Sequence, residues 1–257
     1  MEYSKQWIAF ITLLRKEIIR FTRIWVQTIL PPAITTVLYF VIFGKLIGSQ
    51  LSTINGYQYI DYIVPGLILM TVISNSYANV VSSFFSAKFH RNIEEMLISP
   101  MPGYVILAGF IAGGVARGML VGVVVYAVST FFTTLPLVHP GLGLAVMALT
   151  SLLFSLAGFI NGVFARNFDD ISVIPTFVLA PLTYLGGVFY SIAMLPPTWR
   201  DISLSNPLLY MINGFRHGLL GVSDINPATS IAMTLVFIVL LAALALHLLH
   251  RGSFIKS

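Results

Sequence analysis

The sequence contains no cysteine among its 257 residues, which excludes a disulfide framework and any metal site built on thiolates. Charged residues are almost as scarce, because Asp, Glu, Lys and Arg together make up 9% of the chain. A soluble domain carries about 25% charged residues, so this chain cannot cover a globular surface with polar groups. Hydrophobic residues make up 57%. We therefore expect an integral membrane protein.

Motifs of several function classes are also missing. No G-x-x-x-x-G-K-[ST] loop is present, so the chain cannot hold ATP phosphates by that route. No cluster of His or acidic residues in the apolar segments indicates a metal site, a proton relay or a catalytic site. We expect no catalytic residue, metal or nucleic-acid partner. A carrier or channel that works without an ATPase and a lipid-modifying enzyme remain alternatives, although midplane carboxylates and inverted repeats are not visible.

Six apolar segments are long enough to cross a hydrocarbon core of ~30 Å, which needs about 20 residues of helix. They are residues 26–47, 62–86, 104–132, 142–165, 171–190 and 229–249. We therefore predict an all-α membrane fold with six transmembrane helices in a single domain, 1–257. An even number of spans places both termini on the same side of the membrane.

Lys and Arg are distributed unequally between the two sides of these spans. Three lie on the side of the 191–228 segment: Lys45, Arg200 and Arg216. Ten lie on the other side: Lys5, Arg15, Lys16, Arg20, Arg23, Lys88, Arg91, Arg166, Arg251 and Lys256. Cytoplasmic loops carry the excess of Lys and Arg. We therefore predict that both termini and the loops 87–103 and 166–170 are cytoplasmic.

Residues 4–25 are predicted to form an amphipathic helix. Its apolar side chains recur at alternating spacings of four and three, which places them on one face. They are Trp7, Ile11, Leu14, Ile18, Phe21 and Trp25. The opposite face carries Lys5, Lys16, Arg20 and Arg23. Such a helix lies in the membrane interface with its basic side toward anionic headgroups or a partner. A plain anchor for the first span and a partner contact both fit this pattern.

The third span contains Arg117, the one charged residue away from the ends of the spans. An intramembrane charge is a functional candidate, and a place on a translocation path is one interpretation. The other is structural, because this ~43 Å segment exceeds the membrane thickness and the side chain can extend to the cytoplasmic headgroups. Small residues repeat nearby at Gly114, Gly118 and Gly122, which predicts close packing against another helix.

The loop 88–100, between the second and third spans, is predicted to contain a short amphipathic helix. Arg91 and Glu95 lie four residues apart, which supports a helix, and Ser99-Pro100 ends it. Its apolar side consists of Phe89, Ile93, Met96 and Leu97. A connector at the membrane surface and a helix that docks into a partner both fit this loop.

The stretch 179–216 is neither a clean span nor a clean loop. It reads LAPLTYLGGVFYSIAMLPPTWRDISLSNPLLYMINGFR, with breaks at Pro196-Pro197 and Asn206-Pro207. Apolar runs of about 10–14 residues are typical of re-entrant or interfacial segments. Broken backbone within a membrane must be buried in protein or line a cavity. We therefore expect an external re-entrant segment over residues 191–221.

The spacing within this stretch carries a specific resemblance. The pattern Leu179-x2-Leu182-x2-Leu185-Gly186-x-Val188-x6-Leu195-Pro196-x10-Pro207-Leu208-x-Tyr210-x5-Arg216 resembles the C-terminal signature of the ABC-2 family of ABC-transporter permeases. The six spans and the loop Ile93-Glu94-Glu95-Met96-Leu97-x-Ser99-Pro100 also resemble that family, so the likeness covers essentially the whole chain. The chain looks most similar to short bacterial permeases of the branch with the daunorubicin-resistance, nodulation and polysaccharide exporters.

The resemblance implies a permease subunit of an ABC exporter in the bacterial cytoplasmic (inner) membrane. In that family a homodimer of the permease pairs with two copies of a separate ATP-binding subunit. ATP and Mg²⁺ are expected on that subunit, so this chain is expected to hold no cofactor and not to be an enzyme itself. The exported substrate, which could be drug-, lipid- or glycan-like, is not identified by the sequence.

The resemblance also implies roles for particular residues. The coupling helix that enters a groove of the ATPase is expected to use Phe89, Arg91, Ile93, Glu94, Glu95 and Leu97. A second, smaller contact is expected from Arg166, Asp169 and Asp170. The N-terminal helix is expected to lie beside the ATPase, with a basic face of Lys16, Arg20 and Arg23. The external gate is expected to include Gly186, Gly187, Pro196, Pro207, Tyr210 and Arg216. Arg216 is interpreted as a headgroup-level anchor or a gate contact.

Overall fold

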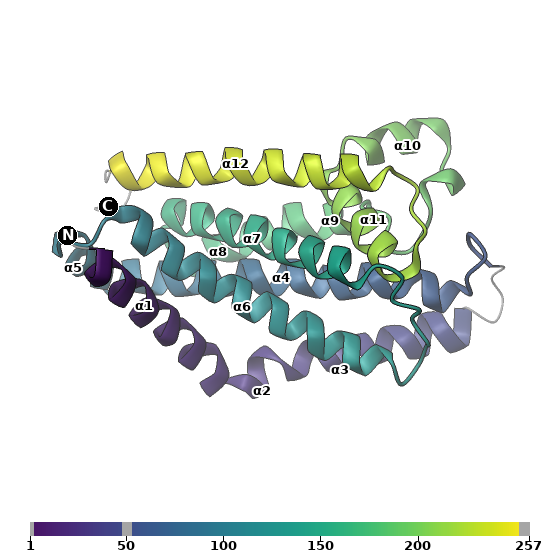
Figure 1. The fold of residues 1–257 in the computed structure, drawn as a ribbon, viewed down its shortest axis with the longest axis horizontal. Helices are drawn as coiled ribbons and strands as arrows, with labels where there is room; N and C mark the ends of the chain where they lie inside the picture. Colours follow the sequence, from purple (N-terminus) through teal and green to yellow (C-terminus); the bar gives the residue numbers. More distant parts are fainter. Residues whose placement is uncertain (1–2, 48–52, 252–257) are drawn as a thin grey trace.

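The computed structural model describes residues 3–47 and 53–251, and within these ranges the chain is helical and contains no β-strand. Figure 1 shows an elongated bundle whose long helices follow its longest axis. The bulk of it consists of α4 (Tyr59–Phe89), α6 (Gly103–Ser129), α7 (Pro140–Phe164) and α12 (Pro227–Arg251). The start of α1 (Tyr3–Arg23) and the end of α12 lie at the same end of the bundle. This agrees with termini on one side of the membrane, although Lys256 lies outside the described residues.

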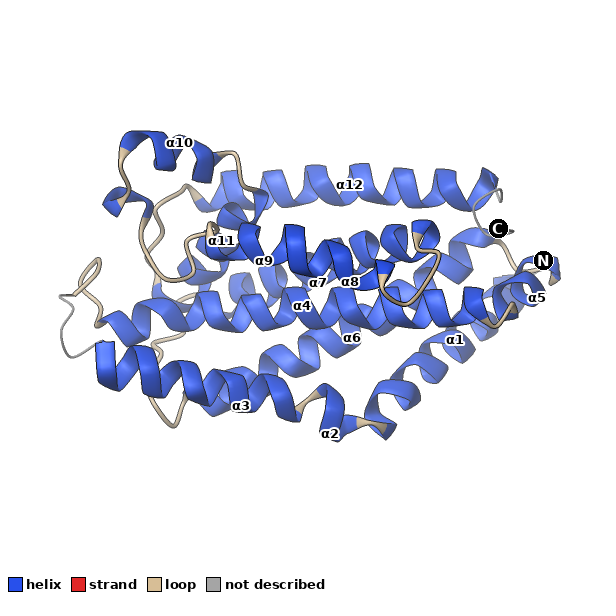
Figure 2. Ribbon diagram, turned by 180° about the vertical axis from the view of Figure 1, so that it is seen from behind, coloured by secondary structure: helices blue, strands red, loops and turns tan. Residues whose placement is uncertain are grey.

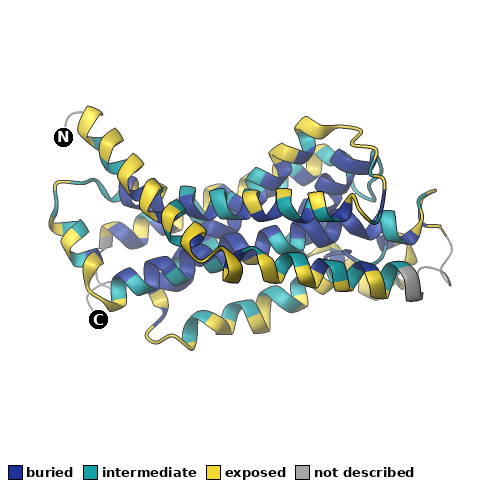
Figure 3. Ribbon diagram, turned by 90° about the horizontal axis from the view of Figure 1, so that it is seen from below, coloured by how far each residue is buried: buried dark blue, intermediate teal, exposed yellow. Residues whose placement is uncertain are grey.

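Small residues let α4, α6 and α7 approach one another at the centre of the bundle. A methyl group at Gly118 of α6 would overlap the hydroxyl of Ser76 on α4 and would lie 2.8 Å from the hydroxyl of Ser151 on α7. One at Gly158 of α7 would lie 2.5 Å from the carbonyl oxygen of Tyr77. These contacts confirm the predicted close packing. Figure 3 shows buried residues along the middle of the bundle and exposed residues along the outer helices.

Five helical segments in the described ranges are long and apolar enough to cross a membrane. Each begins and ends within three residues of a predicted span, and the first of them passes through α2 (Trp25–Thr28), α3 (Leu30–Tyr39) and part of the π-helical η1 (Phe40–Ile47). The predicted fifth span, 171–190, is the exception.

That segment is a short helix of three five-residue pieces: α8 (Asp170–Ile174), η2 (Pro175–Leu179) and α9 (Ala180–Tyr184). It is ~22 Å long at 1.5 Å per residue, less than the ~30 Å of a hydrocarbon core. Pro175 begins the π-helical piece, because a proline lacks the N–H that an α-helical ladder requires. The chain leaves the helix at Tyr184 and turns at Gly187, whose φ of +75° favours glycine.

The N-terminal helix α1 matches its predicted bounds closely, but its packing face differs from the predicted stripe. It is inclined across the bundle, and α2 forms the elbow where the chain turns into α3 (Figures 1 and 2). Leu13 and Glu17 lie against α6, where Gly109 and Gly113 leave room for them. Most of the predicted apolar stripe stays on the surface of the bundle; Trp7, for example, is 64% exposed.

The two ends of the bundle are built differently. The short helix α5 (Asn92–Ile98) lies at the end that holds both termini (Figure 1). The opposite end carries the 3₁₀ turn η3 (Ile192–Met194) and two short helices, α10 (Pro197–Leu204) and α11 (Pro207–Leu220). The breaks at Pro196-Pro197 and Asn206-Pro207 thus fall where the sequence predicts them.

Candidate functional site

The expected coupling helix corresponds to α5. It is shorter than residues 88–100, because α4 continues as a helix to Phe89. Arg91 precedes α5 with a φ of +60°, in the left-handed region. The predicted pair of Arg91 and Glu95 therefore does not lie within one helix. α4 and α5 instead meet at a turn formed by His90 and Arg91.

The side chains around α5 divide into one anchor and several exposed groups. Ile93 has no exposed surface, so it holds α5 against the bundle, which corrects its expected role as a contact offered to a partner. The other expected contacts on the loop are exposed or half-buried: Arg91, Glu94, Glu95 and Leu97. Phe89 is 57% exposed and Ile98 is 86% exposed. The sequence pattern missed Ile98, because it falls outside the apolar side of the predicted helix.

The turn at residues 166–170 adjoins this region through aromatic rings. The ring of Phe168 lies 5.1 Å from that of Phe89, measured between centroids. Asp170 accepts a hydrogen bond from the backbone N–H of Arg166 at 2.8 Å, which closes the turn before α8. Arg166 and Asp169 are exposed. The turn and the α4–α5 corner therefore form one continuous surface at this end.

Lys88 fastens the same end of the bundle. Its ammonium donates to the carbonyl oxygens of Val163 at 2.8 Å and Ala165 at 3.0 Å. These carbonyls belong to the last turn of α7, whose backbone acceptors have no partner within the helix. A cation at a helix C-terminus also interacts favourably with the helix dipole. The charge of Lys88 is thus used within the chain.

A buried carboxylate joins α1 to α4. Glu17 is 1% exposed, accepts from the hydroxyl of Ser83 at 2.6 Å and pairs with Arg20 at 2.9 Å. Arg20 also donates to the carbonyl and the side-chain oxygen of Asn79, at 3.0 and 2.8 Å. This corrects the expectation that Arg20 faces headgroups or the ATPase.

Lys16 and Arg23, by contrast, are exposed as predicted. The sequence analysis did not single out Glu17. Its spacing of four residues from both Leu13 and Phe21 places it on the same helix face as these apolar residues, which could have indicated a buried carboxylate. Its place on the packing face requires a polar partner, because a buried charge without one is strongly destabilising.

Arg117 lies near the middle of the 27-residue helix α6. Its guanidinium donates to the side-chain oxygen of Asn75 on α4 at 2.9 Å, rather than extending along α6 toward the headgroups. This corrects the structural interpretation from the sequence. Asn75 and Asn79, which bind Arg117 and Arg20, lie four residues apart on α4. Glu17, Arg20, Asn75, Asn79, Ser83 and Arg117 form an inner polar cluster between α1, α4 and α6.

Arg216 is the largest fully buried side chain in the described residues. It donates to the carbonyl oxygen of Gly187 at 2.6 Å, and its guanidinium lies 4.0 Å from the centroid of the Tyr62 ring. Burial of this kind contradicts a headgroup-level anchor. The contacts instead tie α11 to α4 and to the turn that follows α9.

Asp224 completes an outer polar cluster with Tyr62, Gly187, Ser191 and Arg216. Its carboxylate accepts from the hydroxyl of Ser191 at 2.8 Å, from the backbone N–H of Ile192 at 3.0 Å and from the hydroxyl of Tyr62 at 3.2 Å. Sequence reasoning missed Asp224 and Tyr62. Asp224 is one of two acidic residues in the outward segment, with Asp201, which was a signal for it, and no signal was available for Tyr62.

The remaining signature residues shape the two short helices. Pro196 precedes α10 and Pro207 is the first residue of α11, where its missing N–H has no intrahelical partner to lose. Tyr210 donates to the carbonyl of Leu204 at 2.8 Å and so bridges the two helices. Gly186 packs against Ile212 of α11, where a Cβ atom would lie 3.0 Å from its methyl group.

Two grooves border α4 on one face of the bundle, where Figure 2 shows α3, α4 and α9. One, of about 230 Å³, lies between α3 and α4, and the other, of about 240 Å³, lies between α4 and the η2–α9 segment. Ser74 lines both and is exposed. The further polar lining residues are Thr35, Thr36, Tyr39, Thr71, Asn75, Tyr77, Thr183 and Tyr184. The rest of both linings is apolar, and Thr71, Ser74 and Asn75 donate to carbonyl oxygens of α4 itself.

Comparisons with known proteins agree with this arrangement. A model of the ABC-2 type transporter family matches residues 8–220. The inner membrane transport permease YadH of Escherichia coli (strain K12) is 55% identical over 252 residues, 98% of each chain. Nodulation protein J of Rhizobium leguminosarum bv. viciae is 24% identical over 219 residues, 84% of this chain and 83% of that protein. The chain therefore belongs to the ABC-2 type transporter family.

Proposed function

We propose that this membrane transport permease is the membrane-spanning subunit of an ATP-driven exporter in the bacterial cytoplasmic (inner) membrane. The observation that carries the proposal is the surface around α5, where Phe89, Glu95 and Ile98 are exposed in a chain without an ATP-binding loop. Clustered exposed apolar side chains favour an interaction site. Membership of the ABC-2 type transporter family supports a separate ATPase as the partner of that site, and the unequal Lys/Arg distribution supports a cytoplasmic position for it.

Coupling requires that motion of the ATPase reach the spans. Ile93 anchors α5 to the bundle, and the Phe89–Phe168 contact joins the α4–α5 corner to the turn before α8. A push on α5 would therefore act on the ends of α4 and α8 together. α4 lines both grooves, and α8 continues into η2, which lines one of them, so the arrangement supports a path along that face.

We propose that two copies of the chain meet across the grooved face and enclose the path between them. Thr71, Ser74 and Asn75 gather on this face of α4 beside mostly apolar linings, and this concentration of small polar side chains supports the proposal. Asn75 lines one groove and accepts from Arg117, which supports a role for Arg117 beside the path. The outer polar cluster is proposed to hold the external segment 191–221 closed until ATP drives the second state.

Permease-stimulated ATP turnover in the reconstituted complex tests the proposal. Ile98→Asp and Phe89→Asp are each expected to lower it at least about tenfold, since an unpaired charge at an apolar contact weakens binding by more than ~1.4 kcal/mol. Glu94→Lys and Leu97→Asp should act in the same direction. Phe131→Asp is the matched control, because Phe131 is 86% exposed at the opposite end, on the α6–α7 loop outside the external segment. Undiminished turnover in the α5 variants, or transport by the permease without any ATPase, would contradict the proposal.

A further inference from the structure

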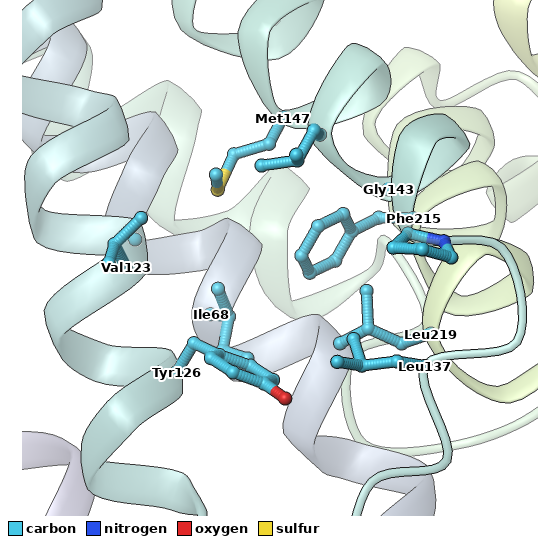
Figure 4. Close-up of a pocket in the computed structure, with 11 residues that line it drawn as sticks. Ile68, Val123, Tyr126, Leu137, Gly143, Met147, Phe215 and Leu219 are labelled. Atoms are coloured by element: carbon cyan, nitrogen blue, oxygen red, sulfur yellow. The ribbon is translucent and has the colours of Figure 1, made fainter.

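A cavity of about 190 Å³ lies on the face of the bundle opposite the two grooves, between α4, α6, α7, α11 and the α6–α7 loop. Figure 4 shows the ring of Phe215 pointing into it, with Ile68, Val123, Tyr126 and Met147 around the ring. Among its eleven lining residues, the hydroxyl of Tyr126 is the one side-chain oxygen or nitrogen. The cavity is therefore almost wholly apolar.

The cavity opens sideways, out of the bundle. Val123 of α6 and Leu144 of α7 line it and are 51% and 54% exposed, so they form its rim. Both residues lie within segments that are long and apolar enough to cross a membrane. The rim therefore faces the hydrocarbon of the bilayer and not water.

The cavity also has a definite depth. It uses the last turns of α6 and the first turns of α7, at the end of the bundle that carries α10 and α11. The loop that connects α6 to α7 exposes Phe131, 86%, and Val138, 45%, at this same end. Exposed apolar side chains beside the ends of spans are typical of the membrane interface. The cavity thus lies in the leaflet next to the α11 end.

The chemistry of the lining selects among possible occupants. Ordered water needs two to four polar partners, and one hydroxyl does not supply them. A second copy of the chain is proposed at the grooved face on the opposite side of the bundle. An acyl chain needs only an apolar slot that opens on hydrocarbon. We propose that one acyl chain of a phospholipid, in the leaflet next to the α11 end, occupies this cavity.

The occupied cavity has a structural consequence. Phe215 and Leu219 line it from α11, and Arg216 holds α11 from within the outer polar cluster. The acyl chain fills the space between α11 and the α6–α7 pair, so it adds dispersion contacts that an empty space lacks. The site goes beyond the transport role, but the choice of lipid over a second copy rests on the proposed dimer face, and the naming of the leaflet as outer rests on the proposed orientation.

Photolabelling of the full chain tests this site without an ATPase, so its outcome is independent of the proposed function. The purified protein is placed in vesicles of phosphatidylethanolamine and phosphatidylglycerol that contain phosphatidylethanolamine with a diazirine in its acyl chain. After irradiation, mass spectrometry locates the label. We expect it to concentrate in the peptides that contain residues 122–126 and 143–147, above the level on α12.

Two variants on different helices cover the opening. Leu144→Trp and Val123→Trp are each expected to abolish the excess label on the opposite wall, and both residues are exposed enough to accept an indole without repacking the core. Val239→Trp on α12, where Val239 is 65% exposed, should leave it unchanged. Label spread evenly over α6, α7 and α12, label undiminished in both variants, or cross-links between two copies at these residues would overturn the proposal.

Discussion

Replacement of Arg216 with Lys is expected to loosen the external end of the bundle. The buried guanidinium donates to the Gly187 carbonyl at 2.6 Å while it lies 4.0 Å over the Tyr62 ring. A Lys ammonium keeps the buried positive charge. Its N–H donors all lie on one nitrogen, however, so it cannot both reach that carbonyl and cover the ring. A hydrogen bond to a charged group contributes ~1.5–3 kcal/mol, and a desolvated cation–π contact contributes ~2 kcal/mol. Either loss makes opening easier by about 2 kcal/mol, which is about a 30-fold larger open population.

Thiol labelling measures that population directly, because the chain contains no cysteine of its own. Ser203→Cys places a single thiol on α10 at a side chain that is 1% exposed and whose hydroxyl makes no hydrogen bond. When opening and closing are fast, the labelling rate by a membrane-impermeant maleimide follows the open population. We expect Arg216→Lys to raise this rate about 30-fold.

Arg200→Lys is the control, since Arg200 is exposed on the same helix, and it should leave the rate unchanged. A rate in the Arg216→Lys background that stays within about twofold of the parent would correspond to less than ~0.5 kcal/mol. That result would show that the contacts of Arg216 do not hold the external segment closed.

Two further substitutions address the inner part of the bundle, and both are read by thermal unfolding of the purified protein in detergent. Glu17→Gln should destabilise by about 2 kcal/mol, below the ~3–5 kcal/mol of a fully buried pair because the Arg20 side chain is 30% exposed. In a double-mutant cycle, Arg20→Gln should cost less in the Glu17→Gln background than in the parent, and equal costs in the two backgrounds would refute the pairing. Gly118→Ala should destabilise by ~1–3 kcal/mol through overlap with its neighbours. Gly141→Ala faces open space and should have no such effect, so equal shifts for the two would contradict the packing argument.

The parts of the fold that were predictable from sequence depend on local patterns. Five spans follow from runs of apolar residues long enough to cross a bilayer, and the breaks at Pro196-Pro197 and Asn206-Pro207 follow from the geometry of proline. The glycine repeat around Gly118 predicts a close helix approach without saying which helix approaches. Each of these patterns acts over a few residues or one helical turn.

The errors share a different origin. Arg20, Ile93 and Arg216 were each assigned to a surface from their immediate neighbours in sequence, and each is held by groups on other elements. The predicted fifth span ended late because apolar composition continues through residues 185–190, where a left-handed turn at Gly187 already redirects the chain. Composition reports where a segment prefers to lie, but it does not report which way the backbone turns.

The sequence by itself determined that this is a multi-pass helical membrane protein, and the spacing of its last third identified the family. Only the tertiary structure decided which partners the buried charged side chains have. Glu17 meets Arg20 and Ser83, and Arg216 meets Tyr62 and Gly187, because helices far apart in the chain bring them together. The physical reason is that apolar burial is governed by local composition, whereas a buried charge is tolerated only beside specific partners whose positions exist once the bundle has packed.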